Sequence, residues 1–332
     1  MAKIRFGLVG CGAISRFHIA AIQHCEQAEL AAVCDSFEPN LKKAVEATGA
    51  QGYSDYMDLI HSADVDAVDI MTASGLHAQI GMEAAKAGKH VIVEKPIDVT
   101  LEASEALVNA CRENGVKLSC IFQRRFGGPV QAIKEAVNRG YFGTLNECCC
   151  HTKWYRDQAY YDCVDWRGTW ALDGGGALMN QSIHYIDLMQ YIMGDVDEVM
   201  GYTATRAHEN IETEDVAVAV LRFQSGALGL LEGTTSAYPG FTTRLDVHGD
   251  QGSVMLENDL IKFWQFRNGV ECDESLKVKG EQSAHFIQIN DFVDAILTDR
   301  EPAVTGEEAI KALKIILAIY ESARTGKPVK VK

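Results

Sequence analysis

The stretch Gly10-Cys11-Gly12-Ala13-Ile14-Ser15 decides the fold of the first part of this chain. An apolar, strand-like run at residues 4–10 leads into it, and a helical pattern over residues 14–24 follows it. Glycines placed in this way between a strand and a helix form the dinucleotide-binding pattern, here with serine at the third glycine position. The motif and its context predict a doubly wound α/β fold.

Each position of the motif has a physical role. Gly10 allows the tight turn, Gly12 lets the backbone approach a pyrophosphate, and Ser15 is small enough for the helix to pack on the strand. Ala13 and Ile14 lie at the start of the helix, where free N–H groups and the helix dipole favour an anion. We therefore expect Gly10, Gly12, Ala13 and Ile14 to bind the phosphates of a dinucleotide.

Asp35 indicates which dinucleotide is bound, because it ends the second predicted strand 20 residues beyond Ser15. A carboxylate at that place binds the ribose hydroxyls of adenosine and repels a 2′-phosphate. Ser36 and Phe37 follow it and offer no arginine to receive such a phosphate. The sequence therefore predicts NAD rather than NADP as the cofactor.

Strand and helix patterns continue to alternate through the first part of the chain, which predicts a parallel sheet covered on both faces. We expect a Rossmann domain over residues 1–122, with the boundary near residues 122–127. The predicted strands are 4–10, 30–35, 67–73, 90–94 and 117–122, and the predicted helices are 14–24, 38–48, 56–62, 77–88 and 101–114.

The pattern changes in the second part, residues 123–332. Short, turn-rich connections join alternating runs there, which predicts an α+β domain with a large open antiparallel sheet. Its strands are expected at 145–154, 216–223, 227–235, 244–248 and 253–257, and its helices at 129–139, 176–193, 284–297 and 307–325.

Charge and composition exclude several classes of partner. The 332 residues carry a formal net charge of -15, so neither nucleic acid nor an anionic membrane is an expected partner. No run is long enough for a membrane span, the first residues do not form a signal peptide, and the ten cysteines are scattered. We expect a cytoplasmic protein with reduced thiols, and buried strand positions rather than metal ligands for Cys148, Cys149 and Cys150. No metal is expected.

Two further motifs carry a family resemblance. Glu94-Lys95-Pro96 follows the strand at 90–94, and together with Gly10 and Gly12 it resembles the Gfo/Idh/MocA oxidoreductases. The stretch from Gly174 to Asp187 is similar to that family's substrate-side helix. The resemblance implies an NAD(P)-dependent dehydrogenase of a small polyhydroxylated substrate, a cis Lys95–Pro96 bond, and a homodimer or homotetramer that covers the open sheet.

The strand ends and the family resemblance point to the catalytic groups. Residues that follow the carboxyl ends of parallel strands line the ligand crevice, so Thr72, His77, Glu94 and Lys95 are expected at the cofactor. Alcohol oxidation needs a base for the hydroxyl proton, and histidine titrates near the working pH. We assign the base to His184 and the stabilisation of developing negative charge to Lys95, the pair that the resemblance also implies.

Substrate-binding residues are expected on the helix at 176–193 and in a loop before it. Asn180, His184 and Asp187 are spaced along one helix face, which must lie toward solvent or toward a site, and the glycine-rich start suggests close approach to a ligand. Asn180 stands where many inositol-type members have aspartate, and an amide orients a hydroxyl but cannot relay a proton. The Asn180-Gln181 pair is closer to members that oxidise C3 of UDP-N-acetyl-glucosaminuronate.

The loop is dense in basic and aromatic residues, among them Arg156 and Trp166, which suit a sugar with an anionic group. A loop packed on its own domain, or an oligomer contact, is the alternative. Three functions follow for testing. The first is an NAD-dependent dehydrogenase of a sugar or nucleotide sugar, the second a cyclitol dehydrogenase, and the third a sensor that binds dinucleotide without turnover. The presence of both Lys95 and His184 argues against the sensor.

Overall fold

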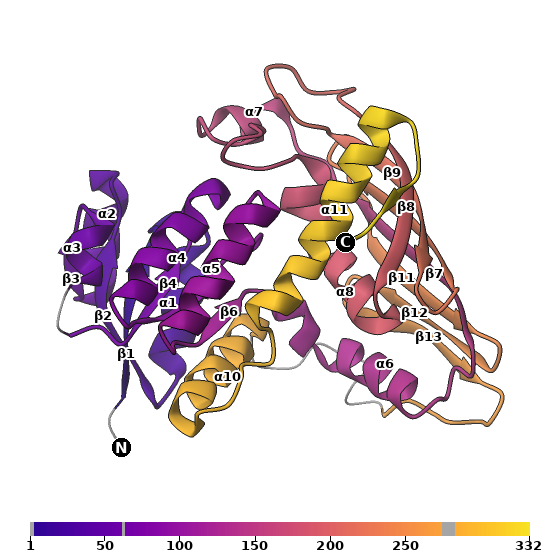
Figure 1. Cartoon of the computed structure of the whole chain (residues 1–332), viewed down its shortest axis with the longest axis horizontal. Coiled ribbons are helices and arrows are strands. Elements are labelled where there is room, and N and C mark those ends of the chain that lie inside the picture. Colours follow the sequence, from indigo (N-terminus) through magenta and orange to yellow (C-terminus); the bar gives the residue numbers. More distant parts are fainter. Residues whose placement is uncertain (1–2, 62–63, 274–282) are drawn as a thin grey trace. The chain divides into compact units, whose positions relative to one another are not determined.

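The computed structural model of the chain describes residues 3–61, 64–273 and 283–332 (Figure 1). The chain divides into two compact units. The first joins residues 1–123 to residues 282–310, and the second joins residues 124–281 to residues 311–332. The chain thus returns to the first unit after most of the second, whereas the sequence order suggested two contiguous domains.

The first unit contains a six-stranded parallel sheet in the order β3-β2-β1-β4-β5-β6, which confirms the predicted Rossmann fold. The order reverses between β1 and β4, so ligands are expected at the carboxyl ends of these two strands. The strands are β1 (Ile4–Val9), β2 (Ala28–Cys34), β3 (Gln51–Tyr53), β4 (Ala67–Ile70), β5 (His90–Val93) and β6 (Leu118–Cys120).

Helices cover both faces of this sheet because its strands are apolar on both sides. Phe6 of β1 packs in a cluster with Ile22 and Phe292, whereas a Cβ on the neighbouring Gly7 would meet Leu59 at 2.5 Å. The helices are α1 (Ser15–His24), α2 (Glu38–Thr48), α3 (Tyr56–Ile60), α4 (His77–Lys86), α5 (Leu101–Glu113) and α10 (Ala284–Thr298). The predicted end of the third helix at residue 62 lies outside the described residues.

The second unit contains an eight-stranded sheet in the order β13-β12-β11-β7-β10-β9-β8-β14. The sheet is mostly antiparallel, which confirms the expected α+β domain, and one neighbouring pair, β7 and β10, is parallel. The strands are β7 (Leu145–Lys153), β8 (Val196–Ala204), β9 (Val216–Phe223), β10 (Leu228–Thr234), β11 (Thr243–Gly249), β12 (Gly252–Glu257), β13 (Leu260–Phe266) and β14 (Val329–Lys330).

Helices cover one face of the second sheet, and the other face keeps exposed apolar side chains. In Figure 1, α6 (Gly128–Asn138) and α8 (Ile183–Met193) lie on the covered face. α7 (Gln158–Asp162) is a short helix in the aromatic loop, and α11 (Gly306–Thr325) begins in the first unit and ends in the second. Exposed residues on β9 and β10 include Val218, Val220, Leu228 and Leu230. Cys148 and Cys150 are buried and Cys149 is less so, as expected for a half-covered strand.

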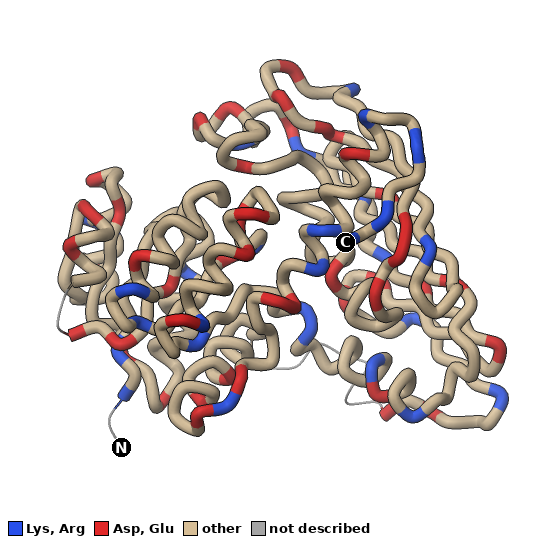
Figure 2. Tube along the Cα trace, in the orientation of Figure 1, with Lys and Arg blue, Asp and Glu red and all other residues tan. Residues whose placement is uncertain are grey.

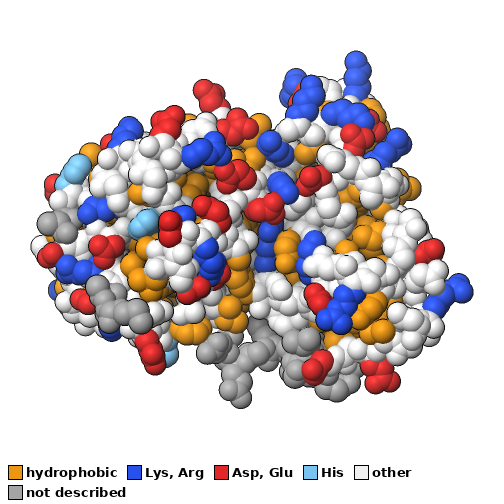
Figure 3. All heavy atoms as spheres, turned by 60° about the horizontal axis from the view of Figure 1, so that its bottom comes forward, with side chains coloured by type: hydrophobic (Ala, Val, Ile, Leu, Met, Phe, Trp, Pro, Cys, Tyr) orange, Lys and Arg blue, Asp and Glu red, His pale blue; other side chains and the backbone are white. Residues whose placement is uncertain are grey.

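Acidic residues are spread along both units instead of forming one run (Figure 2). On the face shown in Figure 3, acidic and basic side chains are mixed. No helix among the described residues combines the length and apolarity that crossing a membrane requires.

Candidate active site

The glycine turn after β1 needs glycine for two reasons. Gly10 has a φ of +100°, and a Cβ at this position would lie 2.5 Å from the carbonyl oxygen of Met71, just after β4. Its N–H donates to the carbonyl of Cys34 at 2.9 Å. The turn is therefore packed against the ends of both neighbouring strands, where the strand order reverses.

The start of α1 fits a phosphate group. Gly12 and Ala13 are exposed, and a Cβ on Gly12 would meet no atom within 4 Å. The helix has no side-chain cap at Ile14, while the Ser15 hydroxyl donates back to the carbonyl of Gly12 at 2.7 Å. Open space before uncapped N–H groups is the arrangement that binds a pyrophosphate.

Asp35 follows β2 and is held by the glycine turn itself. Its Oδ2 accepts the Cys11 N–H at 2.8 Å, and its Oδ1 accepts the Phe37 N–H at 2.8 Å. Asn40 Nδ2 also donates to Oδ2 at 3.3 Å. The carboxylate is thus fixed beside the turn, in the position expected to bind ribose hydroxyls and oppose a 2′-phosphate.

His77 holds two strand-end loops together instead of presenting its ring nitrogens to a ligand. Nδ1 lies 2.8 Å from the carbonyl of Pro96, and Nε2 lies 3.1 Å from the carbonyl of Thr72. The ring is buried, and burial lowers the pKa of His77. The Lys95–Pro96 bond is cis, which confirms the expectation for that bond.

Glu94 is held by a buried histidine. His18 Nδ1 lies 2.8 Å from Asp69 Oδ2, and Nε2 lies 3.1 Å from Glu94 Oε1. Burial alone would lower the pKa of His18, but the two carboxylates raise it to about 10. Burial alone would raise the pKa of Glu94, but hydrogen bonding to His18 and its positive charge lower it to about 2. The ionised Glu94 then accepts the Lys95 N–H at 3.0 Å, which fixes the turn that carries the lysine.

A second histidine, His285, lies near this cluster. The ligand atoms of His18, Glu94 and His285 all lie within 4.8 Å of one another, a spacing that a metal ion could bridge. A metal bound to His18 Nε2 would have to displace the ring proton that is donated to Glu94. We therefore describe the cluster as a buried ion network that holds the Lys95 turn.

In the second unit, a hydrogen-bonded group forms around Tyr160. Its hydroxyl accepts from Gln181 Nε2 at 2.8 Å, and Gln181 Oε1 accepts from Arg156 at 2.9 Å. Asn180 accepts from Gln181 at 2.7 Å and donates from Nδ2 to Asp173 Oδ1 at 2.6 Å. The structure therefore brings the predicted residues Arg156, Asn180 and Gln181 together. Their partners are Tyr160, an aromatic residue of the predicted loop that was not chosen as a site residue, and Asp173, which the sequence did not identify.

Two guanidinium groups stack on the same tyrosine ring. Arg167 lies 4.0 Å and Arg156 lies 5.1 Å from the Tyr160 ring centre. Trp166 is joined to the group through Arg167, which also lies 5.4 Å from its ring centre. Among the described residues, neither arginine forms an ion pair with a carboxylate. Two cations therefore lie at one place without a direct ion pair among the described residues, in a protein of net charge -15.

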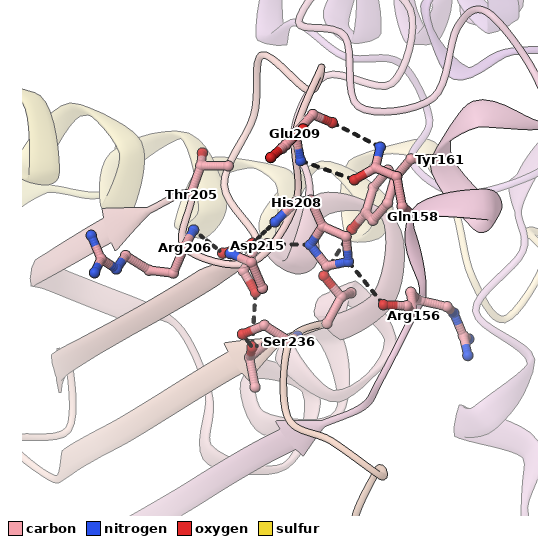
Figure 4. A network of polar contacts seen from close by, with 12 residues as sticks. Arg156, Gln158, Tyr161, Thr205, Arg206, His208, Glu209, Asp215 and Ser236 are labelled. Carbon is pink, nitrogen blue, oxygen red and sulfur yellow. Dashed lines mark hydrogen bonds and ion pairs between the residues drawn. The ribbon is translucent and has the colours of Figure 1, made fainter.

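His208, which is buried, and Glu209, which is exposed, hold the backbone of the loop that carries Arg156 (Figure 4). His208 Nδ1 lies 2.9 Å from Asp215, and Nε2 lies 2.8 Å from the carbonyl of Arg156. Gln158 exchanges hydrogen bonds of 2.8 and 2.9 Å with the backbone of Glu209. The backbone of the loop is therefore fixed on its own domain, which gives Arg156 a defined position.

The helix with the predicted polar stripe does not have one regular geometry. Residues Ala177–Ser182 form a π-helical segment, and α8 starts only at Ile183. His184 lies in the first turn of α8 and is half-buried. Asp187 is buried and forms a two-point ion pair with Arg125 at 2.6 and 2.8 Å, so its assignment to a solvent-facing or site-facing stripe was wrong.

The glycines before this helix approach protein atoms. A Cβ on Gly175 would lie 2.1 Å from the Tyr320 hydroxyl, and one on Gly176 would lie 1.8 Å from the carbonyl oxygen of Glu214. These contacts explain why glycine is needed there, so the interpretation of the run as a close approach to a ligand is corrected.

Comparison with known proteins identifies the family. Residues 4–122 match the Gfo/Idh/MocA oxidoreductase family's NAD-binding Rossmann fold, and residues 134–331 match its C-terminal alpha/beta domain. The chain therefore belongs to the Gfo/Idh/MocA oxidoreductase family, as the sequence motifs indicated.

Relatives of known structure or name cover the whole chain. The WlbA dehydrogenase from Bordetella pertussis, solved in complex with NADH and UDP-GlcNAcA, is 37% identical with a TM-score of 0.95, over 100% of this chain and 98% of that chain. The aldose-aldose oxidoreductase from Caulobacter crescentus, complexed with glycerol, is 28% identical with a TM-score of 0.87, over 99% of each chain. The myo-inositol 2-dehydrogenase of Thermotoga maritima is 28% identical, over 99% of each chain.

Proposed function

We propose that this NAD-dependent oxidoreductase oxidises a secondary alcohol carbon of a nucleotide sugar that carries a carboxylate. The observation that carries the proposal is the pair of arginines on Tyr160, which have no carboxylate partner among the described residues. Arginine binds carboxylate and phosphate groups in a two-point geometry, and such a substrate offers both. The similarity to a dehydrogenase solved with NADH and UDP-GlcNAcA supports the same substrate class.

The cofactor assignment rests on the first unit. The space at Gly12, the uncapped start of α1 and the fixed Asp35 carboxylate all fit NAD. When bound, NAD supplies the hydride acceptor. We assign its phosphates to Gly10, Gly12, Ala13 and Ile14 and its adenosine ribose to Asp35, as the sequence predicted. Thr72, Glu94 and Lys95 then face the rest of the cofactor, with His77 holding the backbone carbonyls of Thr72 and Pro96.

The chain's own residues account for the proton and for the position of the substrate. In the proposed reaction the C–H bond gives its electron pair to the nicotinamide as hydride, the hydroxyl proton passes to His184, and the carbon becomes a carbonyl. Lys95 donates a hydrogen bond to the substrate oxygen and stabilises its negative charge. Asn180 and Gln181 orient neighbouring hydroxyls, and Arg156 with Trp166 binds the anionic part.

A cyclitol dehydrogenase is the second candidate, supported by the similarity to the Thermotoga maritima myo-inositol enzyme. Cyclitols carry no anionic group, so they would leave both arginines without a counter-charge. Asn180 also replaces the aspartate that many inositol-type members have.

We also propose that the chain forms a homodimer or homotetramer in the cytoplasm. The support is the exposed apolar face of the second sheet, where Val218, Val220 and Leu228 are each 45% to 56% exposed. Apolar side chains gathered on one uncovered face mark an association surface.

Incubation with NAD and a set of substrates distinguishes these functions. The set contains UDP-GlcNAcA, its neutral analogue UDP-GlcNAc, and myo-inositol, and NADH formation is followed at 340 nm. The proposal predicts the highest catalytic efficiency for the acidic nucleotide sugar. Preference for myo-inositol would establish the cyclitol enzyme instead, and NADH binding with no turnover of any of the three would support a sensor.

A further inference from the structure

Glu214 is a buried carboxyl group that the proposed reaction does not use directly. It lies just before β9, and its side chain is directed at the start of the π-helical segment. Oε2 accepts the Gly176 N–H at 3.0 Å, Oε1 accepts the Leu178 N–H at 2.8 Å, and the Glu214 carbonyl accepts the Ala177 N–H at 2.9 Å. One residue therefore binds three consecutive N–H groups.

These contacts replace the cap that the segment lacks. The first N–H groups of a helix have no partner within the helix, and this segment has no side-chain cap at Gly176. The Tyr320 hydroxyl of α11 donates to Glu214 Oε1 at 3.0 Å and holds the carboxyl group from the other side. The glycines at 175 and 176 leave no room for a Cβ, because Tyr320 and Glu214 lie directly against the backbone there. The start of the segment therefore has one position relative to these two side chains.

The register of this segment decides where the proposed substrate residues lie. A π-helical turn contains an extra residue relative to an α-helix, so a shift at its start rotates every later side chain. Asn180 and Gln181 are on the segment, and His184 follows in the first turn of α8. We propose that Glu214 is the positioning residue of the substrate helix and that its carboxylate fixes the π-helical register that aims Asn180, Gln181 and His184. This inference rests on the proposed function.

The ionisation of Glu214 gives the inference a measurable signature. Burial raises the pKa of Glu214 to about 7, although its hydrogen bonds to backbone N–H groups and to Tyr320 oppose the rise. The titratable groups that face it are Tyr320 of α11 and Tyr161 of α7, and Asp173 adds a negative charge near Tyr320. We call the contacts of Glu214 with the N–H groups of residues 176–178 the Glu214 clamp. A protonated carboxyl group loses acceptor capacity, so this clamp weakens as the pH falls through about 7.

Glu214→Gln tests the clamp because the amide has one acceptor oxygen, and its NH2 group would face a backbone N–H. The expected result is a fall in kcat of between about tenfold and a hundredfold, the scale of a small misplacement of reacting groups. The acid limb of the pH profile that depends on Glu214 should disappear, while NADH affinity stays unchanged. Glu212→Gln is the matched control, since it removes a charge from the same loop at an exposed position.

Tyr320→Phe provides an independent test, and it decides the matter if Glu214→Gln does not fold. Loss of the hydroxyl removes a donor that favours the ionised carboxyl group, so the acid limb should move to higher pH. A merely structural role would lower the melting temperature and leave the acid limb in place. Folded Glu214→Gln with wild-type kcat and pH profile would overturn the inference.

Amide hydrogen exchange of residues 176–184 separates this inference from the proposed function. Glu214→Gln should accelerate exchange there whether or not a substrate has been found. If the wild-type protein turns over no substrate but exchange accelerates, only the proposed function fails. If exchange is unchanged, the clamp itself is refuted.

Discussion

Asn180→Asp is the substitution whose effect the structure defines best. Asn180 Nδ2 donates to Asp173 Oδ1 at 2.6 Å, so the new carboxyl group would lie against an existing one that is buried. Two carboxyl groups at this distance share one proton, and the second ionisation of such a pair lies roughly 3 pKa units above the first. At neutral pH the variant should therefore hold a proton between the two residues.

The pH dependence of stability follows from this raised pKa. An aspartate in the unfolded chain ionises near pH 4, whereas the folded pair keeps its proton to about pH 7. The neutral form is favoured by folding, so the variant matches the wild type at low pH and loses stability as the pH rises between these values. At about 1.4 kcal/mol per pKa unit, the loss reaches roughly 4 kcal/mol.

Urea unfolding of both proteins at pH 4.5, 6 and 7.5 measures the effect. The difference in unfolding free energy should grow steeply with pH, whereas Asn180→Ala, which only removes a hydrogen bond donated to the Asp173 carboxylate, should show a smaller rise. While the two carboxyl groups hold one proton, Asn180→Asp adds no net charge, so the His184 pKa seen in the rate profile should not change. That pKa should rise only if both carboxyl groups are ionised in the pH range where His184 titrates. A constant difference for Asn180→Asp at all three pH values would refute the contact between Asn180 and Asp173.

Three further predictions concern the cofactor, the base and the open sheet. NADH should bind more tightly than NADPH in fluorescence titrations, because Asp35 opposes a 2′-phosphate; the reverse order would remove the cofactor assignment. His184→Ala should lower the maximal rate by about two to four orders of magnitude and leave NADH affinity intact; near-normal turnover would exclude His184 as the base. Leu228→Asp should shift the mass measured by light scattering toward the monomer, because it charges the apolar face; an unchanged oligomer would place the interface elsewhere.

The parts of the fold that could be predicted from sequence are those with a local cause. The strand Val216–Phe223 was predicted with the bounds that the structure has, because its apolar residues alternate and a turn follows. The glycine turn at Gly10 was recognised because strand, motif and helix are adjacent in the sequence. In each case the residues that decide the structure lie within a few positions of one another.

The parts that could not be predicted depend on residues far apart in the chain. The polar spacing of Asp187 is compatible with a site, and only the fold shows that Arg125 neutralises it. The glycines at 175 and 176 indicated a close approach, but nothing local identified Glu214 as the group approached. The return of residues 282–310 to the first unit has the same cause, since helix patterns do not state which sheet they cover.

The sequence predicted several residues of the candidate site, but not the hydrogen bonds that join them. Arg156, Asn180 and Gln181 were chosen by residue type and by family resemblance, and the structure joins them through Tyr160. Tyr160 belonged to a loop known to be aromatic, but no signal distinguished it from the aromatic residues around it.

Transfer of deuterium from substrate to cofactor tests the central claim most directly. The protein is incubated with NAD and UDP-GlcNAcA that carries deuterium at C3, and the NADH formed is analysed by mass spectrometry. The account predicts NADH with one deuterium and a sugar product with a carbonyl at C3. NADH formed without deuterium would mean that another carbon is oxidised, and no NADH under any condition would contradict the assignment of this chain as a nucleotide-sugar dehydrogenase.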